Sequence, residues 1–293
     1  MFARILVPLD GSEFGELALR YAEELAGAFG AELTLLLVCE PAEAKYRHMS
    51  QLYLDKVAAE AKARINASPS GAQVKAVISD GVAATEITDF ANKNDTNLVI
   101  MVSHGRSGMK SWSIGSTATE VIQRASQPVL LVRAGAPIAR ANNEKVLRQI
   151  LVALDGSEIS EATLPYIREF ASKLELKVIL LRVVPTGEHV HTVGGLDYIL
   201  FPEQLVEKMK TEAQQYLEAT GALFKETKAE VGYEVREGNA AEEIIRMADQ
   251  NCSSLVAMSS HGRSGIKRWI FGSVTHKVLH GGSRPILLVK ARG

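Results

Sequence analysis

The chain repeats itself, and this repetition constrains its fold more than any other feature of the sequence. Three segments recur with little or no change: Ile5–Glu13 as Ile150–Glu158, Ser103–Gly108 as Ser260–Gly265, and Pro128–Val132 as Pro285–Val289. A repeat of this size is as long as a whole domain of roughly 100–200 residues, whereas solenoid repeats are roughly 20–50 residues long. The sequence therefore predicts two tandem copies of one domain.

The separations between equivalent residues locate the boundaries of the two copies. Asp10 and Asp155 are 145 residues apart, whereas Gly115 and Gly272 are 157 residues apart, so the second copy carries a net insertion of 12 residues. We assign the insertion to the segment 185–202, which contains glycine and histidine, has little periodicity and is expected to be a loop. The predicted boundaries are a first domain at 1–135, a linker at 136–146 and a second domain at 147–293.

Within each copy, short apolar runs alternate with segments of helical periodicity. In the first copy the expected strands are Ile5–Leu9, Leu33–Val38, Val74–Ile78, Leu98–Val102 and Val129–Val132, and the expected helices are 12–29, 52–65, 84–94 and 116–123. Continuous apolar strands that alternate with helices are typical of a parallel sheet covered on both faces. The sequence predicts an α/β fold of two tandem doubly wound domains, each a Rossmann-like five-stranded parallel sheet. Pro8 is discordant, because proline removes a hydrogen-bond donor from an inner strand.

Composition excludes several classes of protein. The net charge is −1, so no overall positive field attracts nucleic acid or an anionic membrane. No apolar run approaches the roughly 20 residues that span a membrane, and the N-terminus leads into a strand rather than a signal peptide. The two cysteines, Cys39 and Cys252, are too few for a disulfide framework. We expect a cytoplasmic protein with no nucleic-acid or membrane partner.

Ligands of doubly wound sheets bind beyond the carboxyl ends of the strands, and three features converge there. Asp10 and Asp155 end the first strand of each copy, and a glycine-containing loop, 103–115 or 260–272, follows the fourth strand. Each loop leads into a helix, whose free N–H groups and positive dipole end attract phosphate. The Walker A pattern is absent. The alternative interpretation is that these glycines only serve tight turns.

These residues resemble the universal stress protein family, and the resemblance covers both copies apart from the linker and the segment 185–202. Nucleotide-binding members of the family carry the pattern Gly-x2-Gly-x9-Gly-Ser/Thr after the fourth strand and an Asp after the first. Gly105 and Gly115-Ser116 match the end of that pattern, as do Gly262 and Gly272-Ser273. The first glycine of the pattern is replaced by Val102 in the first copy and by Ser259 in the second. A serine side chain is smaller than valine, so the second copy is expected to be the better site.

The resemblance implies an adenine nucleotide α-hydrolase-like fold that binds ATP, ADP or AMP with Mg²⁺. The implied binding residues of the first copy are Pro8, Leu9, Asp10, Val38, Met101, Val102, His104, Gly105, Arg106, Gly115, Ser116 and Thr117. Those of the second copy are Ala153, Leu154, Asp155, Val183, Met258, Ser259, His261, Gly262, Arg263, Gly272, Ser273, Val274 and Thr275. In the family, strands like Val129–Val132 form the dimer contact, so we expect the two domains to pair within the chain or the chain to form a homodimer.

Three classes of function stay open at this stage. The leading hypothesis is a cytoplasmic, nucleotide-dependent regulator of the stress response that acts on an unidentified protein partner. The alternative is a dimerisation or interaction module without nucleotide, and the third is an enzyme of adenylate chemistry on the same fold. No nucleophile, base and orienting residue form a set, so we expect no catalytic residue. The enzymatic activity that stays open is slow ATP hydrolysis. His189 and His191 lack a third metal ligand and are expected to be solvated, so no metal site is predicted.

Overall fold

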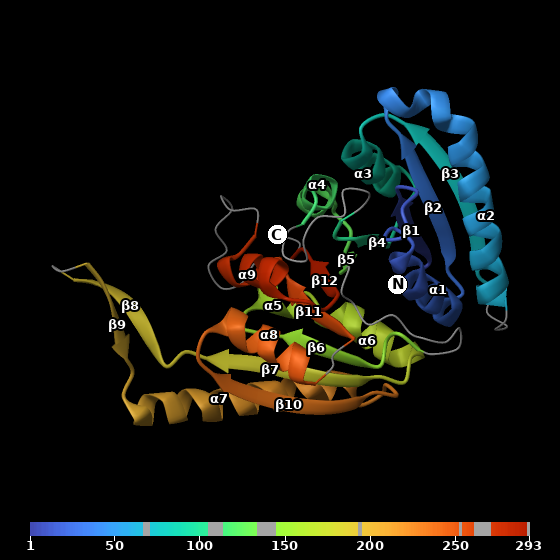
Figure 1. Cartoon of the computed structure of the whole chain (residues 1–293). Coiled ribbons are helices and arrows are strands. Elements are labelled where there is room, and N and C mark those ends of the chain that lie inside the picture. Colours follow the sequence, from blue (N-terminus) through green and yellow to red (C-terminus); the bar gives the residue numbers. More distant parts are fainter. Residues whose placement is uncertain are drawn as a thin grey trace. The chain divides into compact units, whose positions relative to one another are not determined.

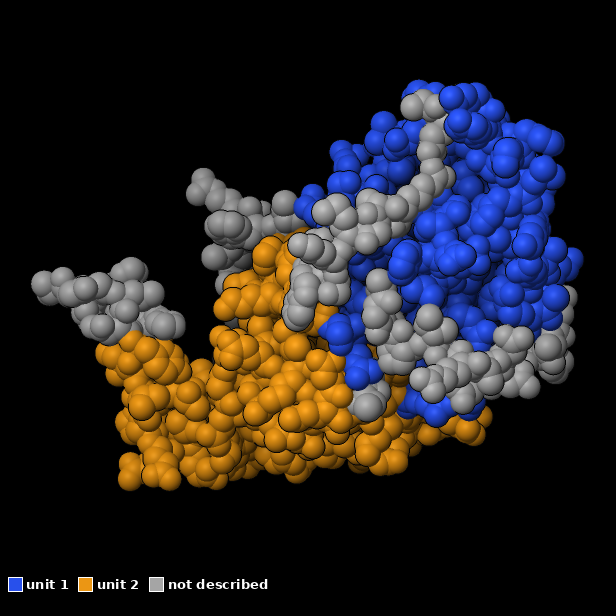
Figure 2. All heavy atoms as spheres, viewed as in Figure 1, with its two compact units in different colours: residues 1–148, 283–290 blue, residues 149–282, 291–293 orange. Residues whose placement is uncertain are grey.

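The computed structural model describes residues 1–66, 71–104, 114–133, 145–192, 195–251, 254–260 and 271–291. The chain divides into two compact units, which Figure 2 shows in different colours. The first unit comprises residues 1–148 and 283–290, and the second comprises residues 149–282 and 291–293. Most of the expected linker, 136–146, lies outside the described residues.

The first unit is built on a sheet of six strands (Figure 1). In chain order its elements are β1 (Arg4–Leu9), α1 (Leu17–Phe29), β2 (Glu32–Cys39), the 3-10 helix η1 (Pro41–Tyr46), α2 (Arg47–Asn66), β3 (Gln73–Asp80), α3 (Ala83–Lys93), β4 (Leu98–Val102), α4 (Ser116–Arg124), β5 (Val129–Val132) and β12 (Ile286–Val289). The sheet order is β12-β5-β4-β1-β2-β3, and all strands except β12 run parallel. Helices α1 and α2 cover one face and α3 and α4 cover the other, as predicted (Figure 1).

The second unit repeats the alternation of strands and helices, but it holds four strands of the main sheet instead of the expected five, because the last strand of its repeat, β12, belongs to the first unit. Its elements are β6 (Gln149–Ala153), α5 (Glu158–Glu161), α6 (Leu164–Lys173), β7 (Lys177–Val184), β8 (Gly187–Thr192), β9 (Gly195–Leu200), α7 (Glu203–Gly221), the 3-10 helix η2 (Ala222–Phe224), β10 (Glu230–Glu237), α8 (Ala240–Gln250), β11 (Leu255–Ser259) and α9 (Ser273–Gly281). Strands β10, β7, β6 and β11 lie side by side and run parallel. The expected doubly wound α/β fold is confirmed.

The core follows from the apolar strands. Leu6, Val7, Leu35, Val99 and Leu130 are all fully buried, because helices cover both faces of a parallel sheet. Burying these side chains removes apolar surface from water, and each Å² removed stabilises the fold by about 25 cal/mol. This hydrophobic effect is the main force that holds the helices on the sheet.

Strand β12 is the last strand of the second repeat, yet it belongs to the first compact unit. It pairs antiparallel with β5, with Ile286 opposite Leu131, Leu287 opposite Leu130 and Leu288 opposite Val129. These side chains are buried. The pairing of these two strands, expected from the family resemblance, is therefore present in the chain.

The expectation that the segment 185–202 is a loop was wrong. Strands β8 and β9 pair antiparallel as a separate two-stranded sheet, with Gly187 opposite Leu200 and Thr192 opposite Gly195. The segment contains Val190, Thr192, Tyr198 and Ile199, which are β-branched or aromatic residues that favour strands, and the search for periodicity overlooked this signal. Figure 1 shows this hairpin extending away from the sheet of the second unit.

Pro8 is tolerated because of where neighbouring strands pair with β1. Strand β2 pairs with β1 from Arg4 to Leu9, whereas β4 pairs with it at Ile5 and Leu6. Pro8 lies beyond the residues that pair with β4, so its missing N–H interrupts neither of these two pairs.

The first helix begins later than expected, at Leu17 instead of Ser12. The Asp10 carboxylate accepts hydrogen bonds from the backbone N–H and the hydroxyl of Ser12, at 3.0 and 2.6 Å. Such local bonds compete with a helix and favour a turn. Gly11 supports the turn with a φ of 81°, a conformation that side chains rarely adopt.

No helix in the described parts of the chain is long and apolar enough to cross a membrane. Cys39 is buried and forms no disulfide. Cys252 lies outside the described residues.

Candidate functional site

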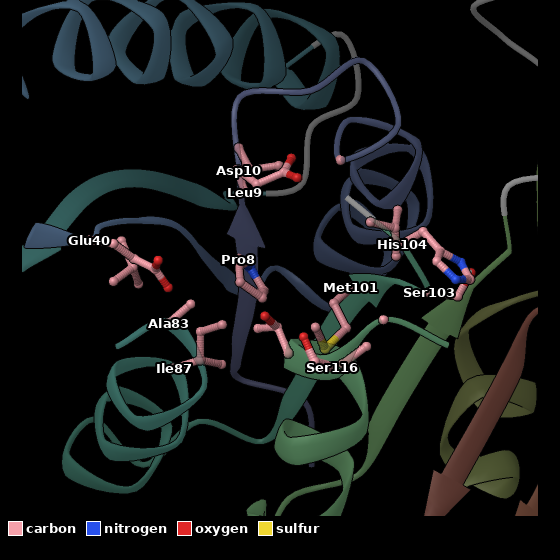
Figure 3. A pocket seen from close by; sticks show the side chains of 16 residues that line it. Pro8, Leu9, Asp10, Glu40, Ala83, Ile87, Met101, Ser103, His104 and Ser116 are labelled. Atoms are coloured by element: carbon pink, nitrogen blue, oxygen red, sulfur yellow. The ribbon is translucent and has the colours of Figure 1, made fainter. Parts of the chain in front are cut away.

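Each unit has a cavity beyond the carboxyl ends of its parallel strands, where the fold predicts a ligand site. The first cavity has a volume of about 270 Å³ and lies between the ends of β1, β2 and β4 and the starts of α3 and α4 (Figure 3). Ten predicted residues line it: Pro8, Leu9, Asp10, Val38, Met101, Val102, His104, Gly115, Ser116 and Thr117. The fold therefore brings together residues that are more than 100 positions apart in the sequence.

The second cavity has a volume of about 300 Å³ and occupies the equivalent place in the second unit. Ten predicted residues line it: Ala153, Leu154, Asp155, Val183, Met258, Ser259, Gly272, Ser273, Val274 and Thr275. The remaining predicted residues, Gly105, Arg106, His261, Gly262 and Arg263, lie outside the described residues.

Sequence reasoning missed part of each cavity wall. The additional residues are Gly15, Glu40, Ala83, Ile87, Ser103 and Ala118 in the first cavity, and Ser160, Leu181, Ala240 and Ile244 in the second. Several of them follow the second strand or begin the third helix of their repeat. The rule that ligands lie beyond strand ends applies to every strand, so it could have pointed to Glu40 and Ala83.

The acidic residue after the first strand is held in the same way in both units. Asp10 accepts from the Ser12 hydroxyl at 2.6 Å, and Asp155 accepts from the Ser157 hydroxyl at 2.6 Å. Hydrogen bonds to a carboxylate are among the stronger ones in proteins. These bonds keep each carboxylate oriented at the edge of its cavity.

The helices that border the cavities begin alike. Gly115 precedes α4 with φ −61° and ψ 154°, and Gly272 precedes α9 with φ −62° and ψ 153°. Neither helix has a side-chain cap or an acidic residue in its first turn. The first N–H groups of a helix have no partner inside the helix, so these two termini offer hydrogen-bond donors and a positive dipole end to an anion.

The Universal stress protein family model matches residues 1–133 and 147–290, which is nearly the whole chain. The chain belongs to the universal stress protein family.

Individual relatives agree with the family match. A universal stress protein of Mycolicibacterium smegmatis is 24% identical over 305 residues and covers 98% of this chain and 97% of its own length. One from Methanocaldococcus jannaschii is 31% identical over 149 residues, covering 51% of this chain and 85% of that protein. The crystal structure of a universal stress protein from Archaeoglobus fulgidus has a TM-score of 0.67 at 18% identity and covers 99% of both chains. Its likeness supports the tandem universal stress protein fold.

His104 lines the first cavity of this universal stress protein. Burial, followed by the nearby positive charge of Arg133, lowers its pKa from the ordinary value of 6.5. The imidazole is therefore mostly neutral at neutral pH. It can exchange hydrogen bonds with a ligand, but it does not add a fixed positive charge to the cavity.

Two residues stand where the family pattern has its first glycine. Val102 is half-buried and lines the first cavity, whereas Ser259 is buried and lines the second. The Thr275 hydroxyl donates to the Ser259 carbonyl oxygen at 3.0 Å, which joins α9 to the end of β11. The first cavity therefore has a β-branched wall where the second has a hydroxyl.

Proposed function

We propose that each cavity binds ATP or ADP with Mg²⁺, and that this universal stress protein acts as a nucleotide-dependent regulator of the stress response. One observation carries the proposal. In both units an uncapped helix N-terminus and an oriented aspartate lie on the wall of the same cavity.

The polarity of the first cavity suits a nucleotide. Val38, Ala83 and Ile87 form an apolar wall that suits a base, and Ser116 and Thr117 lie at the helix N-terminus, which suits phosphates. Asp10 stands beside the end of β1 (Figure 3), where its carboxylate can accept hydrogen bonds from ribose hydroxyls. A volume of about 270 Å³ is near the lower end of the usual range for small-molecule sites, roughly 300–1,000 Å³.

The proposed Mg²⁺ depends on the nucleotide. Among the described residues, no group of three or more His, Cys, Asp or Glu side chains lies close enough together to hold a metal ion. Mg²⁺ in nucleotide sites is usually bound by phosphate oxygens, waters and one or two carboxylates. We therefore expect Mg²⁺ to be held mainly by the phosphate oxygens and by water.

The test is calorimetric titration of the nucleotide-free chain with Mg·ATP. We expect two sites per chain. Val38 and Val183 line equivalent walls, so Val38→Trp should fill the first cavity and Val183→Trp the second, each leaving one site. A folded chain that binds no Mg·ATP would rule the proposal out, and one site in the unsubstituted chain would limit it to one cavity.

A second candidate function has an observation of its own. Strand β12 pairs with β5 through buried leucines, which is the pairing expected of an interaction module. In that case the chain would bind a protein partner, or a second copy, without nucleotide. The same titration separates the candidates, because the interaction module requires no heat of ATP binding.

A further inference from the structure

Glu40 brings a carboxylate to the first cavity that the second cavity lacks. It follows β2 directly, and Figure 3 shows its side chain on the same side of the cavity as Ala83 and Ile87, with the carboxylate turned toward the cavity. Ser116 and the start of α4 lie on another side. Glu40 therefore stands at the end that suits a base and away from the end that suits phosphates.

The main chain holds this position in the same way in both units. The Gly81 N–H donates to the Cys39 carbonyl oxygen at 3.1 Å, and the Gly238 N–H donates to the Val184 carbonyl oxygen at 3.0 Å. The next residue along the chain is Glu40 in the first unit and Pro185 in the second. The backbone is thus held alike at this point in both units, and the side chain that follows differs.

The Glu40 carboxylate is available to a ligand. Among the described residues it forms no hydrogen bond and no ion pair, whereas Asp10 is held by Ser12. Arg47, which is close in sequence, pairs with Asp80 instead. Pro41 follows Glu40 and confines its backbone to the extended region, which limits the directions that its side chain can take.

We propose that Glu40 makes the first cavity selective for a base with an exocyclic amine, such as the 6-amino group of adenine, and that the second cavity does not discriminate. This inference rests on the proposed nucleotide function. A carboxylate only accepts hydrogen bonds, so it favours an amine that donates and gains nothing from a base that carries hydrogen there. In the second cavity, Val183, Ala240 and Ile244 form the corresponding wall without a charged group.

The test compares ATP with purine riboside 5′-triphosphate, which differs only by hydrogen in place of the 6-amino group. In a Val183→Trp chain, which retains the first cavity, we expect the analogue to bind about tenfold more weakly than ATP, as befits the loss of one hydrogen bond to a charged group. In a Val38→Trp chain, which retains the second cavity, both should bind within about twofold of each other.

Two exchanges between the cavities complete the test. The quantity compared is the affinity for ATP divided by the affinity for purine riboside 5′-triphosphate. Glu40→Ala should lower this ratio at the first cavity to about its value at the second. Pro185→Glu should raise the ratio of the second. If a filled-cavity variant does not fold, a two-site titration of the unsubstituted chain should show one affinity that changes with the analogue and one that does not.

The outcomes separate this inference from the function on which it rests. If neither triphosphate binds the folded chain, both fail. If both bind the first cavity equally, or if Glu40→Ala leaves the ratio unchanged, the inference is overturned while nucleotide binding stands.

Discussion

The backbone N–H of Gly115 donates to the carbonyl oxygen of Ser103 at 2.8 Å, and Gly272 makes the same bond to Ser260 at 2.9 Å. Each bond joins the chain just after the fourth strand of its repeat to the start of the helix that borders a cavity. A Cβ atom at Gly115 would lie 3.3 Å from the Ser103 oxygen, which is a tight contact. This closeness fixes where the N–H groups of α4 point.

We expect Gly115→Val to weaken Mg·ATP binding at the first cavity by about tenfold or more, because the added side chain pushes the helix start away from Ser103. The same overpacking should lower the free energy of unfolding by about 1–3 kcal/mol. The measurements are calorimetry and urea unfolding. Gly27→Val is the matched control, because Gly27 lies in α1 with no atom near its Cβ position. Unchanged affinity in folded Gly115→Val protein would exclude the helix start as the phosphate site.

Ser12→Ala should hold the Asp10 carboxylate less firmly, because the hydroxyl bond is lost while the bond from the backbone N–H of residue 12 stays. The Ser12 hydroxyl donates to Asp10 at 2.6 Å and accepts from the Gly15 N–H at 3.0 Å. Losing a hydrogen bond to a carboxylate should cost about 1–3 kcal/mol in urea unfolding. Calorimetry should show weaker nucleotide binding at the first cavity only, and Ser157→Ala should reverse that pattern. A uniform effect on both cavities would contradict this role for Ser12.

Leu287→Ala should destabilise the first unit, although Leu287 lies near the C-terminus. Leu287 is fully buried opposite Leu130 in the β12–β5 pair. Truncating a buried leucine typically costs about 2–5 kcal/mol. Hydrogen exchange measured by mass spectrometry should report faster exchange in β5. Leu223→Ala, at a side chain that is 47% exposed, is the control and should have little effect. Unchanged exchange in β5 would show that β12 adds little to this sheet.

Glu24 should make stability depend on pH. Burial raises the pKa of its carboxyl group above the ordinary 4.5, while hydrogen bonds from the Val146 and Leu147 backbone N–H groups partly oppose the rise. The folded chain therefore holds this proton more tightly than the unfolded chain does. The Glu24 carboxyl group therefore makes its full contribution to the free energy of unfolding below about pH 4.5, and this contribution is lost as the pH rises through the raised pKa.

The comparison is with Glu24→Gln, which cannot titrate. We expect the unfolding free energy of the unsubstituted chain, minus that of the variant, to fall between about pH 4 and pH 7. Urea unfolding across this range measures it. Glu13→Gln, at an exposed position, provides the control. A difference that rises with pH would mean that the two backbone hydrogen bonds outweigh burial.

Some site residues were readable because their signals are local. Asp10 and Ser12 are two positions apart, and Gly115 directly precedes the helix that it starts. Ile87 was missed because nothing in its neighbouring sequence marks it, and Glu40 was missed although it directly follows the second strand. They reach the first cavity only through the parallel order of β1, β2 and β4 and the position of α3.

The sequence by itself determined the duplication, the alternation of strands and helices, and the edge of the sheet at which a ligand would lie. These follow from local periodicity and from repeated segments. Tertiary structure alone decided that β12 belongs to the first compact unit and that Glu40 and Ile87 line the first cavity. An apolar strand carries no record of which edge it will join, because backbone hydrogen bonds are the same for every neighbour. That choice depends on which pairing buries the most side-chain surface, and this is a property of the whole fold.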